Sequence, residues 1–229
     1  MKTAVKFQLT GNQLKLLALL TMTCDHIGVT LFPRIGWFRL IGRLALPIFA
    51  YMIAEGCRYT RSRKRYLMSL MAVAALCQLV YFFAMGSLYM CIMVTFSLSV
   101  ALIYLWDWAK QQPAPKGGFL VLAALGAAWV LCEAPLLPGT DFAIDYGIFG
   151  VLLPVLIYLG KDRKQAFFMT ALGLTFLGFS RGGIQWFALL GLVPLAFYSG
   201  TRGKQKLKYL FYIYYPVHLA VIWFIGLFL

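Results

Sequence analysis

Charged residues are scarce in this sequence. Only 12% of its 229 residues are charged, and just seven of these are acidic. The chain also contains only two histidines. A soluble domain usually has about a quarter of its residues charged, because it must cover a water-exposed surface. The composition therefore excludes an ordinary soluble domain.

Cysteine patterns that would form a disulfide framework or a metal site are also missing. The five cysteines lie within or at the ends of apolar stretches, without CxxC spacing: Cys24, Cys57, Cys77, Cys91 and Cys132. We interpret them as small apolar packing residues and expect no metal. No small-residue cleavage site follows the first apolar stretch, so no cleavable signal peptide is evident. With no long linker and no clear internal repeat, we expect one domain over residues 1–229.

Hydrophobic residues dominate the chain at 62%, and aromatic residues contribute 17%. A helix of roughly 20 apolar residues crosses a hydrocarbon core about 30 Å thick. Nine apolar stretches approach this length, at residues 13–32, 38–57, 67–86, 88–108, 118–134, 143–160, 165–180, 183–198 and 209–228. The sequence therefore predicts an all-α, polytopic integral membrane helix bundle with about nine transmembrane helices.

The distribution of lysine and arginine predicts the orientation of these helices. Sixteen basic residues fall in the N-terminal tail and in every second connection, against three in the alternate connections, Arg34, Arg39 and Arg181. Basic connections stay in the cytoplasm, so we expect a cytoplasmic N-terminus and an external C-terminus. The net charge of +14 is then a topology signal. Because the basic residues do not gather on one face of a soluble domain, we expect no nucleic-acid partner.

A few polar residues lie inside the predicted spans, where charged groups are costly unless they pair or line a polar cavity. They are Asp25, His26, Arg43 and His218, together with Asp145 and Tyr146, which open the span at 143–160 from its external side. On the predicted topology, Asp25, His26 and Arg43 lie in the outer half of the membrane. These six residues form the candidate catalytic site.

Asp25 and His26 are neighbours in sequence, so their side chains point about 100° apart on a helix and need partners on other helices. Arg43 is the natural counterion for Asp25, because a buried, unpaired carboxylate would take up a proton. His26 would then be free for general acid or base chemistry. Two simpler interpretations stay open: Asp25 and Arg43 only clamp two helices, and His26 only satisfies a hydrogen bond.

A second polar group lies at the predicted cytoplasmic end of the span at 38–57. Glu55 precedes a basic run that contains Arg58, Arg61 and Lys64. The run can contact anionic lipid headgroups or hold the phosphates of a cytoplasmic cofactor. Glu55 can also be a helix-end charge that reaches the membrane interface. We keep these four residues as candidates for cofactor binding.

Several segments resemble the TraX family of membrane proteins. They are residues 14–18 (LKLLA), 21–28 (TMTCDHIG), 41–50 (IGRLALPIFA), Glu55-Gly56 with 59–67 (YTRSRKRYL), Asp145-Tyr146-Gly147, and 210–212 (LFY) with 215–218 (YPVH). The resemblance covers the whole chain and is most specific in residues 1–67. Between residues 85 and 140 it is a resemblance of hydropathy only.

The resemblance implies a multi-pass acyltransferase of the bacterial inner membrane, similar to a pilin N-terminal acetylase. It also implies a relation to wider transmembrane acyltransferases, including the heparan-glucosaminide N-acetyltransferases. Acetyl-CoA would be the cytoplasmic acyl donor, held near Arg58, Arg61 and Lys64. The acceptor would be an external or membrane-bound amine or hydroxyl of a peptide N-terminus, a glycan or a lipid. The oligomeric state stays open, a homo-oligomer included.

Within that framework the candidate residues take defined roles. An acceptor must lose a proton as it attacks the thioester, and His26 is placed to take the proton or to carry the acyl group. The oxyanion needs hydrogen-bond donors, for which Arg43, Tyr146 or His218 are available. The sequence does not separate an acyl-histidine route from direct transfer.

Two other classes of function compete with acyl transfer. Embedded Asp, His and Arg side chains also build the proton and substrate paths of transporters and channels. The paired Gly- or Pro-broken helices of inverted-repeat transporters are not evident, however. A noncatalytic scaffold would use the charges only to fix helix packing. We expect an acyltransferase, with a proton-coupled small-molecule transporter or channel as the alternative.

Overall fold

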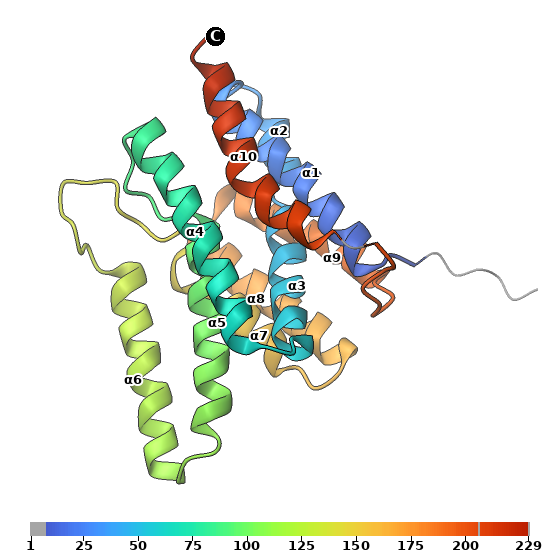
Figure 1. Ribbon diagram of the computed structural model, residues 1–229, viewed down its shortest axis with the longest axis vertical. Coiled ribbons are helices and arrows are strands. Elements are labelled where there is room, and N and C mark those ends of the chain that lie inside the picture. The colour runs from blue at the N-terminus through green and yellow to red at the C-terminus, as the bar shows by residue number, and fades with distance from the viewer. Residues whose placement is uncertain (1–7, 206, 229) are drawn as a thin grey trace, which may run out of the picture.

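The computed structural model describes residues 8–205 and 207–228, and this part of the chain is a bundle of helices (Figure 1). The α-helices are α1 (Gly11–Thr30), α2 (Gly36–Gly42), α3 (Ala45–Tyr59), α4 (Arg63–Met85), α5 (Ile92–Ala109), α6 (Ala114–Glu133), α7 (Gly147–Leu159), α8 (Arg163–Arg181), α9 (Leu192–Ala196) and α10 (Lys208–Gly226), with a 3-10 helix η1 (Gly183–Gly191) before α9. The described residues contain no β-strand, only two isolated bridges. The all-α prediction is confirmed.

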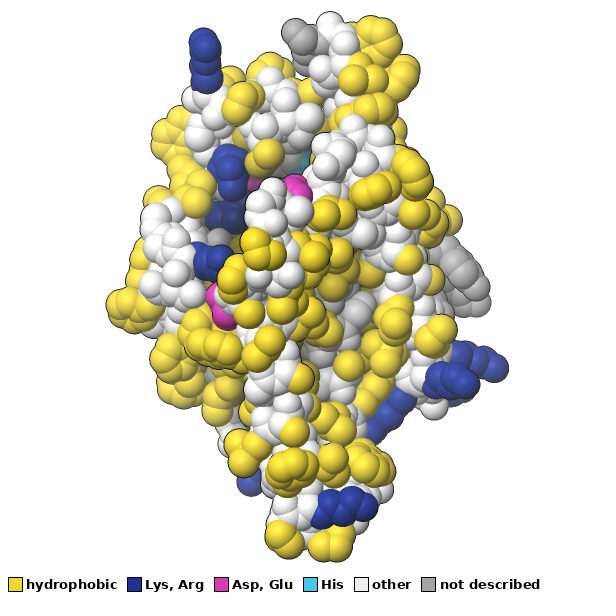
Figure 2. All heavy atoms as spheres, turned by 90° about the vertical axis from the view of Figure 1, so that its left-hand side faces the viewer, with side chains coloured by type: hydrophobic (Ala, Val, Ile, Leu, Met, Phe, Trp, Pro, Cys, Tyr) yellow, Lys and Arg dark blue, Asp and Glu magenta, His cyan; other side chains and the backbone are white. Residues whose placement is uncertain are grey.

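Four helical segments are long and apolar enough to cross a membrane, namely Gly36–Tyr59, Arg63–Met85, Ile92–Ala109 and Ala114–Glu133. Three shorter helical segments are also apolar: Gly147–Leu159, Gly183–Ala196 and Leu210–Gly226. Large apolar side chains cover much of the outer surface, as Figure 2 shows for one face. Such a surface suits lipid better than water. The count of nine spans and the orientation stay predictions.

Helices α3, α5 and α7 form the centre of the bundle, and the other helices pack around them. The core draws fully buried side chains from several helices, including Leu14 of α1, Ile48 of α3, Phe96 of α5, Leu153 of α7 and Leu174 of α8. Helix α6 stands at the edge (Figure 1), and only its Gly117 and Ala128 are buried. Neighbouring helices therefore position any residue that points inward from α1, α3 or α7.

The predicted span at 38–57 corresponds to the apolar segment Gly36–Tyr59, in which the helix is interrupted between α2 and α3 at Arg43 and Leu44. Pro47 gives the physical reason. Proline has no N–H to donate to the Arg43 carbonyl four residues earlier, and its ring conflicts with that carbonyl. The Arg43 N–H still bonds to the Arg39 carbonyl and ends α2. The break lies beside a charged residue, and it shapes the site described below.

Connections that the charge count assigns to the same face lie together in the structure. The start of α1 joins the segment before α10: the Gly11 N–H bonds to the Thr201 carbonyl at 2.8 Å. At the other end, Met90 exchanges backbone bonds with Ala143 and Asp145. Which face is cytoplasmic stays a prediction, and Lys2, Lys6 and Lys206, which contributed to the count, lie outside the described residues.

Candidate functional site

Arg43 is the centre of a buried ion-pair network at the break between α2 and α3. Its side chain is buried, and Nη2 donates to both carboxylate oxygens of Asp25 on α1, each at 2.6 Å. Nη1 donates to the Tyr146 hydroxyl at 3.1 Å and to Oε1 of Gln185 on η1 at 3.2 Å. Arg39 also lies 3.4 Å from Asp25. The predicted Asp25–Arg43 pair is confirmed, and its role stays a prediction.

A glycine allows this approach. A Cβ atom on Gly42 would overlap the Asp25 side chain and lie 2.6 Å from its Oδ1. Gly42 is the last residue of α2, so the end of that helix rests directly against the carboxylate. The broken helix and the small residue before Arg43 together bring the guanidinium to Asp25.

Tyr146 holds an unusual backbone conformation next to this network. It has a φ of 60°, in the left-handed region that a bulky residue rarely adopts, and Gly147 follows at φ 55°. The first turn of α7 is fixed by Glu133, whose Oε1 accepts the Ile148 N–H at 2.8 Å. Backbone strain of this kind persists only where the surroundings hold it, and it gathers at functional sites.

The two histidines contact each other. His26 Nδ1 lies 2.7 Å from His218 Nε2, and the rings stack with centroids 5.0 Å apart. His218 Nδ1 lies 2.9 Å from the Tyr214 carbonyl oxygen. Since a carbonyl oxygen only accepts, the proton is on His218 Nδ1, and Nε2 of the neutral ring accepts from His26 Nδ1. His26 Nε2 is therefore the nitrogen that keeps a free lone pair.

A cavity of about 50 Å³ connects the two parts of the site. Its polar walls come from Asp25, His26, Asp145 and Tyr146, and the rest of its lining is Met22, Gly42, Ala45, Leu46, Phe49, Ile92, Phe96 and Tyr215. A water molecule needs roughly 10–15 Å³ of such space, so the cavity has room for a few waters or a group of acetyl size. Arg43 and His218 contact its wall residues, so all six predicted site residues gather at one place.

Two residues of the site were missed by sequence reasoning. Gln185 is buried, and a polar residue inside the apolar segment 183–198 was the available signal. The Tyr89 hydroxyl donates to Asp145 Oδ1 at 2.6 Å. No sequence signal separates Tyr89 from the rest of the 13 tyrosines in the chain.

The four residues predicted for cofactor binding divide into two groups. Arg58 Nη2 donates to the carbonyls of Ile157 and Gly160 at 2.7 and 2.6 Å, so it caps the C-terminal end of α7. Its Nη1 pairs with Glu55 at 3.2 Å. Arg61 and Lys64 are exposed. Only these two point into open surroundings where a phosphate could reach them without breaking a described bond.

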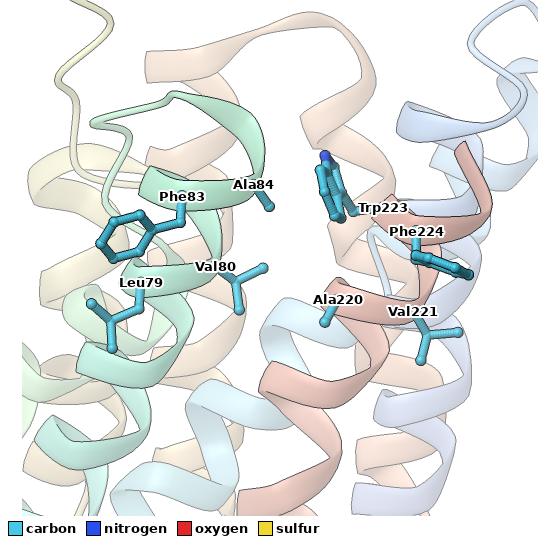
Figure 3. A pocket seen from close by; sticks show the side chains of 8 residues that line it. All are labelled: Leu79, Val80, Phe83, Ala84, Ala220, Val221, Trp223 and Phe224. Carbon is cyan, nitrogen blue, oxygen red and sulfur yellow. The ribbon is translucent and has the colours of Figure 1, made fainter. Parts of the chain in front are cut away.

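A larger cleft, of about 560 Å³, lies between α4 and α10 (Figure 3). Its lining is hydrophobic: Leu79, Val80, Phe83, Ala84, Ala220, Val221, Trp223 and Phe224. No residue of the polar network lines it, so the chemistry of the site belongs to the small cavity.

The fold and site define an all-helical protein with apolar helices of membrane-crossing length and a buried cluster of ionisable side chains. The chain belongs to the TraX family, because the family model described as TraX protein matches residues 10–226. It is 26% identical to the probable fimbrial assembly protein FimC, serogroup H1, of Dichelobacter nodosus, over 92% of this chain and 93% of the relative. It is 50% identical over 38 residues to the uncharacterized protein RP591 of Rickettsia prowazekii (strain Madrid E), covering 17% of this chain and 15% of that protein. No solved structure matches the chain.

Proposed function

We propose that this protein is a membrane-embedded acyltransferase that moves an acetyl group from cytoplasmic acetyl-CoA to an amine or hydroxyl of an external or membrane-bound acceptor. The observation that carries the proposal is the histidine pair at the cavity. The hydrogen bond between His26 Nδ1 and His218 Nε2, at 2.7 Å, leaves the basic lone pair on His26 Nε2. A fixed tautomer with one free nitrogen is what a general base requires.

The proposed chemistry uses both sides of the cavity. His26 Nε2 takes a proton from the acceptor as the acceptor attacks the thioester carbon, and His218 keeps the imidazole oriented. The Tyr146 hydroxyl accepts a bond from Arg43, at 3.1 Å, so its own proton is left to donate to the oxyanion of the tetrahedral intermediate. CoA then leaves as a thiolate and takes the proton back from His26.

The proposed sidedness follows from the basic connections. With nine spans and the N-terminus in the cytoplasm of a bacterial cell, the CoA phosphates would lie near Arg61 and Lys64, and the acceptor would come from outside. The name of the FimC relative concerns fimbrial assembly. A pilin-like peptide N-terminus is thus one acceptor, beside glycan and lipid groups. A cavity of about 50 Å³ has room for the reacting groups only, so the pantetheine arm needs a passage that opens on binding.

One observation favours the second candidate, a proton-coupled small-molecule transporter. Helices broken at a charged residue, as α2 and α3 are at Arg43, also form transporter binding sites. The histidine pair could then carry protons rather than deprotonate an acceptor. A transporter of this kind would have no reason to bind acetyl-CoA, so binding of the acyl donor separates the two proposals.

Acetyl-CoA binding to the purified protein in detergent tests the proposed function. Acetyl-CoA at 100 times its dissociation constant should stabilise the folded state by about 2.7 kcal/mol, seen as a rise in the unfolding temperature. The His26→Ala variant should keep this shift, because His26 contacts the acceptor and not CoA. If neither acetyl-CoA nor a longer acyl-CoA shifts unfolding, the acyltransferase proposal fails.

A further inference from the structure

The two carboxylates at the cavity have different partners. Asp25 is neutralised by Arg43 at 2.6 Å and Arg39 at 3.4 Å. Within residues 8–205 and 207–228, no cationic nitrogen lies within 4.0 Å of the Asp145 carboxylate. Asp145 still borders the same cavity as His26. One wall of the cavity thus carries a carboxylate with no ion-pair partner within 4.0 Å, and Arg43 and Arg181 act on it only from farther away.

Asp145 is also held firmly in place. The Tyr89 hydroxyl donates to its Oδ1 at 2.6 Å, and the Thr95 hydroxyl donates to its backbone carbonyl at 2.8 Å. No described hydrogen bond reaches Oδ2. A carboxylate oxygen that is removed from water normally accepts hydrogen bonds from protein groups. The Asp145 Oδ2 is therefore available to accept from a donor on a ligand.

We propose that Asp145 is the specificity-determining residue that binds the acceptor's protonated amine and selects it over a hydroxyl. The inference rests on the proposed function and assigns a role within the same site. An ammonium group supplies a positive charge at ion-pair distance and N–H donors for the Asp145 Oδ2, whereas a hydroxyl supplies only one donor and no charge. Its nitrogen would lie in the cavity that His26 also borders.

The proton balance is consistent with this placement. The ammonium loses one proton to His26 Nε2, and the neutral amine forms a C–N bond to the acetyl carbon. His26 releases that first proton to water, and as the C–S bond breaks on collapse of the intermediate, the second proton passes from the nitrogen through His26 to the CoA thiolate. The products are an N-acetyl amide with one N–H, CoA thiol and one proton released to water. Asp145 holds the remaining N–H groups throughout and exchanges no proton.

Binding of L-alaninamide and L-lactamide tests the proposal without requiring turnover. The two probes differ only in an amine against a hydroxyl, and the amine is mostly protonated at pH 7. Each is titrated against the purified protein, and its dissociation constant is taken from the shift in unfolding temperature. Wild type should bind alaninamide about tenfold more tightly than lactamide, the low end for a charge-assisted hydrogen bond. In Asp145→Asn the two probes should bind with about equal affinity.

Asp141→Asn is the matched control. Asp141 lies in the same connection, but it is exposed, and hydrogen bonds from the Ser87 hydroxyl and the Leu88 N–H lower the pKa of its carboxyl. This variant should keep the preference. Should Asp145→Asn fail to fold, Tyr89→Phe should change the preference, because it removes the 2.6 Å hydrogen bond that both satisfies and orients the Asp145 carboxylate.

Two results would overturn the proposal. The first is that wild type binds both probes with equal affinity. The second is that the preference for alaninamide is unchanged in Asp145→Asn or Tyr89→Phe. Failure of acetyl-CoA to bind would instead reject the proposed acyl transfer, so the two failures are distinguishable.

Discussion

Hydrogen-bond direction decides the chemistry at the scale of single residues. The Tyr214 carbonyl fixes the His218 tautomer, and His218 in turn fixes that of His26. The Thr23 and Tyr214 hydroxyls, 2.7 Å apart, tie the same turns of α1 and α10 together. The pair therefore differs from a lone buried histidine that only satisfies a hydrogen bond.

Replacing each histidine separately should give a graded loss of acetyl transfer. His26→Ala removes the base and should lower the rate by about 10²- to 10⁴-fold. His218→Phe keeps the base but removes the nitrogen that accepts the hydrogen bond from His26 Nδ1, so the rate should fall less than in His26→Ala. In His218→Gln the amide oxygen can accept from His26 and should restore part of the rate. The measurement is the initial rate with radiolabelled acetyl-CoA. If His218→Gln transfers acetyl groups no faster than His218→Phe, the hydrogen bond between the two histidines has no role in catalysis.

Removing Arg43 should destabilise the protein strongly. Arg43→Ala leaves the mostly buried Asp25 carboxylate without its closest partner, and breaking a buried pair typically costs about 3–5 kcal/mol. Arg63→Ala is the control, since it breaks the 2.7 Å pair with Asp107 at a side chain that is 50% exposed. An exposed pair contributes up to about 1 kcal/mol. Denaturant unfolding in detergent measures both. Similar losses in the two variants would contradict the burial argument.

The Asp25–Arg43 pair could be predicted from the sequence, and the histidine contact could not. A buried carboxylate needs a cation, and the spans hold few of them, so Arg43 was the natural partner for Asp25. His26 and His218 are 192 positions apart, and neither requires the other electrostatically. Their contact depends on how α10 packs against α1, which composition does not reveal. Gln185 and Tyr89 were missed for the same reason, because their contacts also depend on how the helices pack.

Helix boundaries show what hydropathy predicts at the scale of elements. Each predicted apolar stretch overlaps one helix or one consecutive set of helices. Hydropathy does not distinguish one helix from two, however, so the break at Arg43 and Leu44 was missed. Pro47 was the available signal, but proline is tolerated both inside membrane helices and in the first turn of a new one. The segment at 183–198 similarly divides into η1 and α9.

Glycine at position 42 should be indispensable, whereas the glycine at position 36 of the same helix should not be. In Gly42→Ala the new methyl group would overlap Asp25, so α1 and α2 must separate and the Asp25–Arg43 pair must loosen. Nothing lies within 4 Å of a Cβ built at Gly36. Gly36→Ala should therefore be neutral or stabilise by up to about 1 kcal/mol. Unfolding temperatures and transfer rates of both variants test this. Equal behaviour would mean that the close approach has no role.

Sidedness belongs to the scale of the whole molecule. The connections rich in lysine and arginine lie at one end of the bundle, and Thr140 lies in a connection at the other end. We predict that the end carrying Ser62 faces the cytoplasm. In a variant without Cys24 and Cys132, which are the partly exposed native cysteines, Thr140→Cys should react with an impermeant thiol reagent added to intact cells, and Ser62→Cys should not. Labelling of position 62 from outside would invert the topology and reject transfer from cytoplasmic acetyl-CoA.

Transfer across a sealed membrane tests the central claim most directly. Inside-out membrane vesicles present the cytoplasmic face to the medium, so acetyl-CoA with a radiolabelled acetyl group is added outside and L-alaninamide is sealed inside. Wild-type vesicles should accumulate labelled N-acetyl-alaninamide in the lumen, and His26→Ala vesicles, containing equal amounts of folded protein, should not. A lumen without labelled product in wild-type vesicles, or an equal amount of product with His26→Ala, would contradict the account.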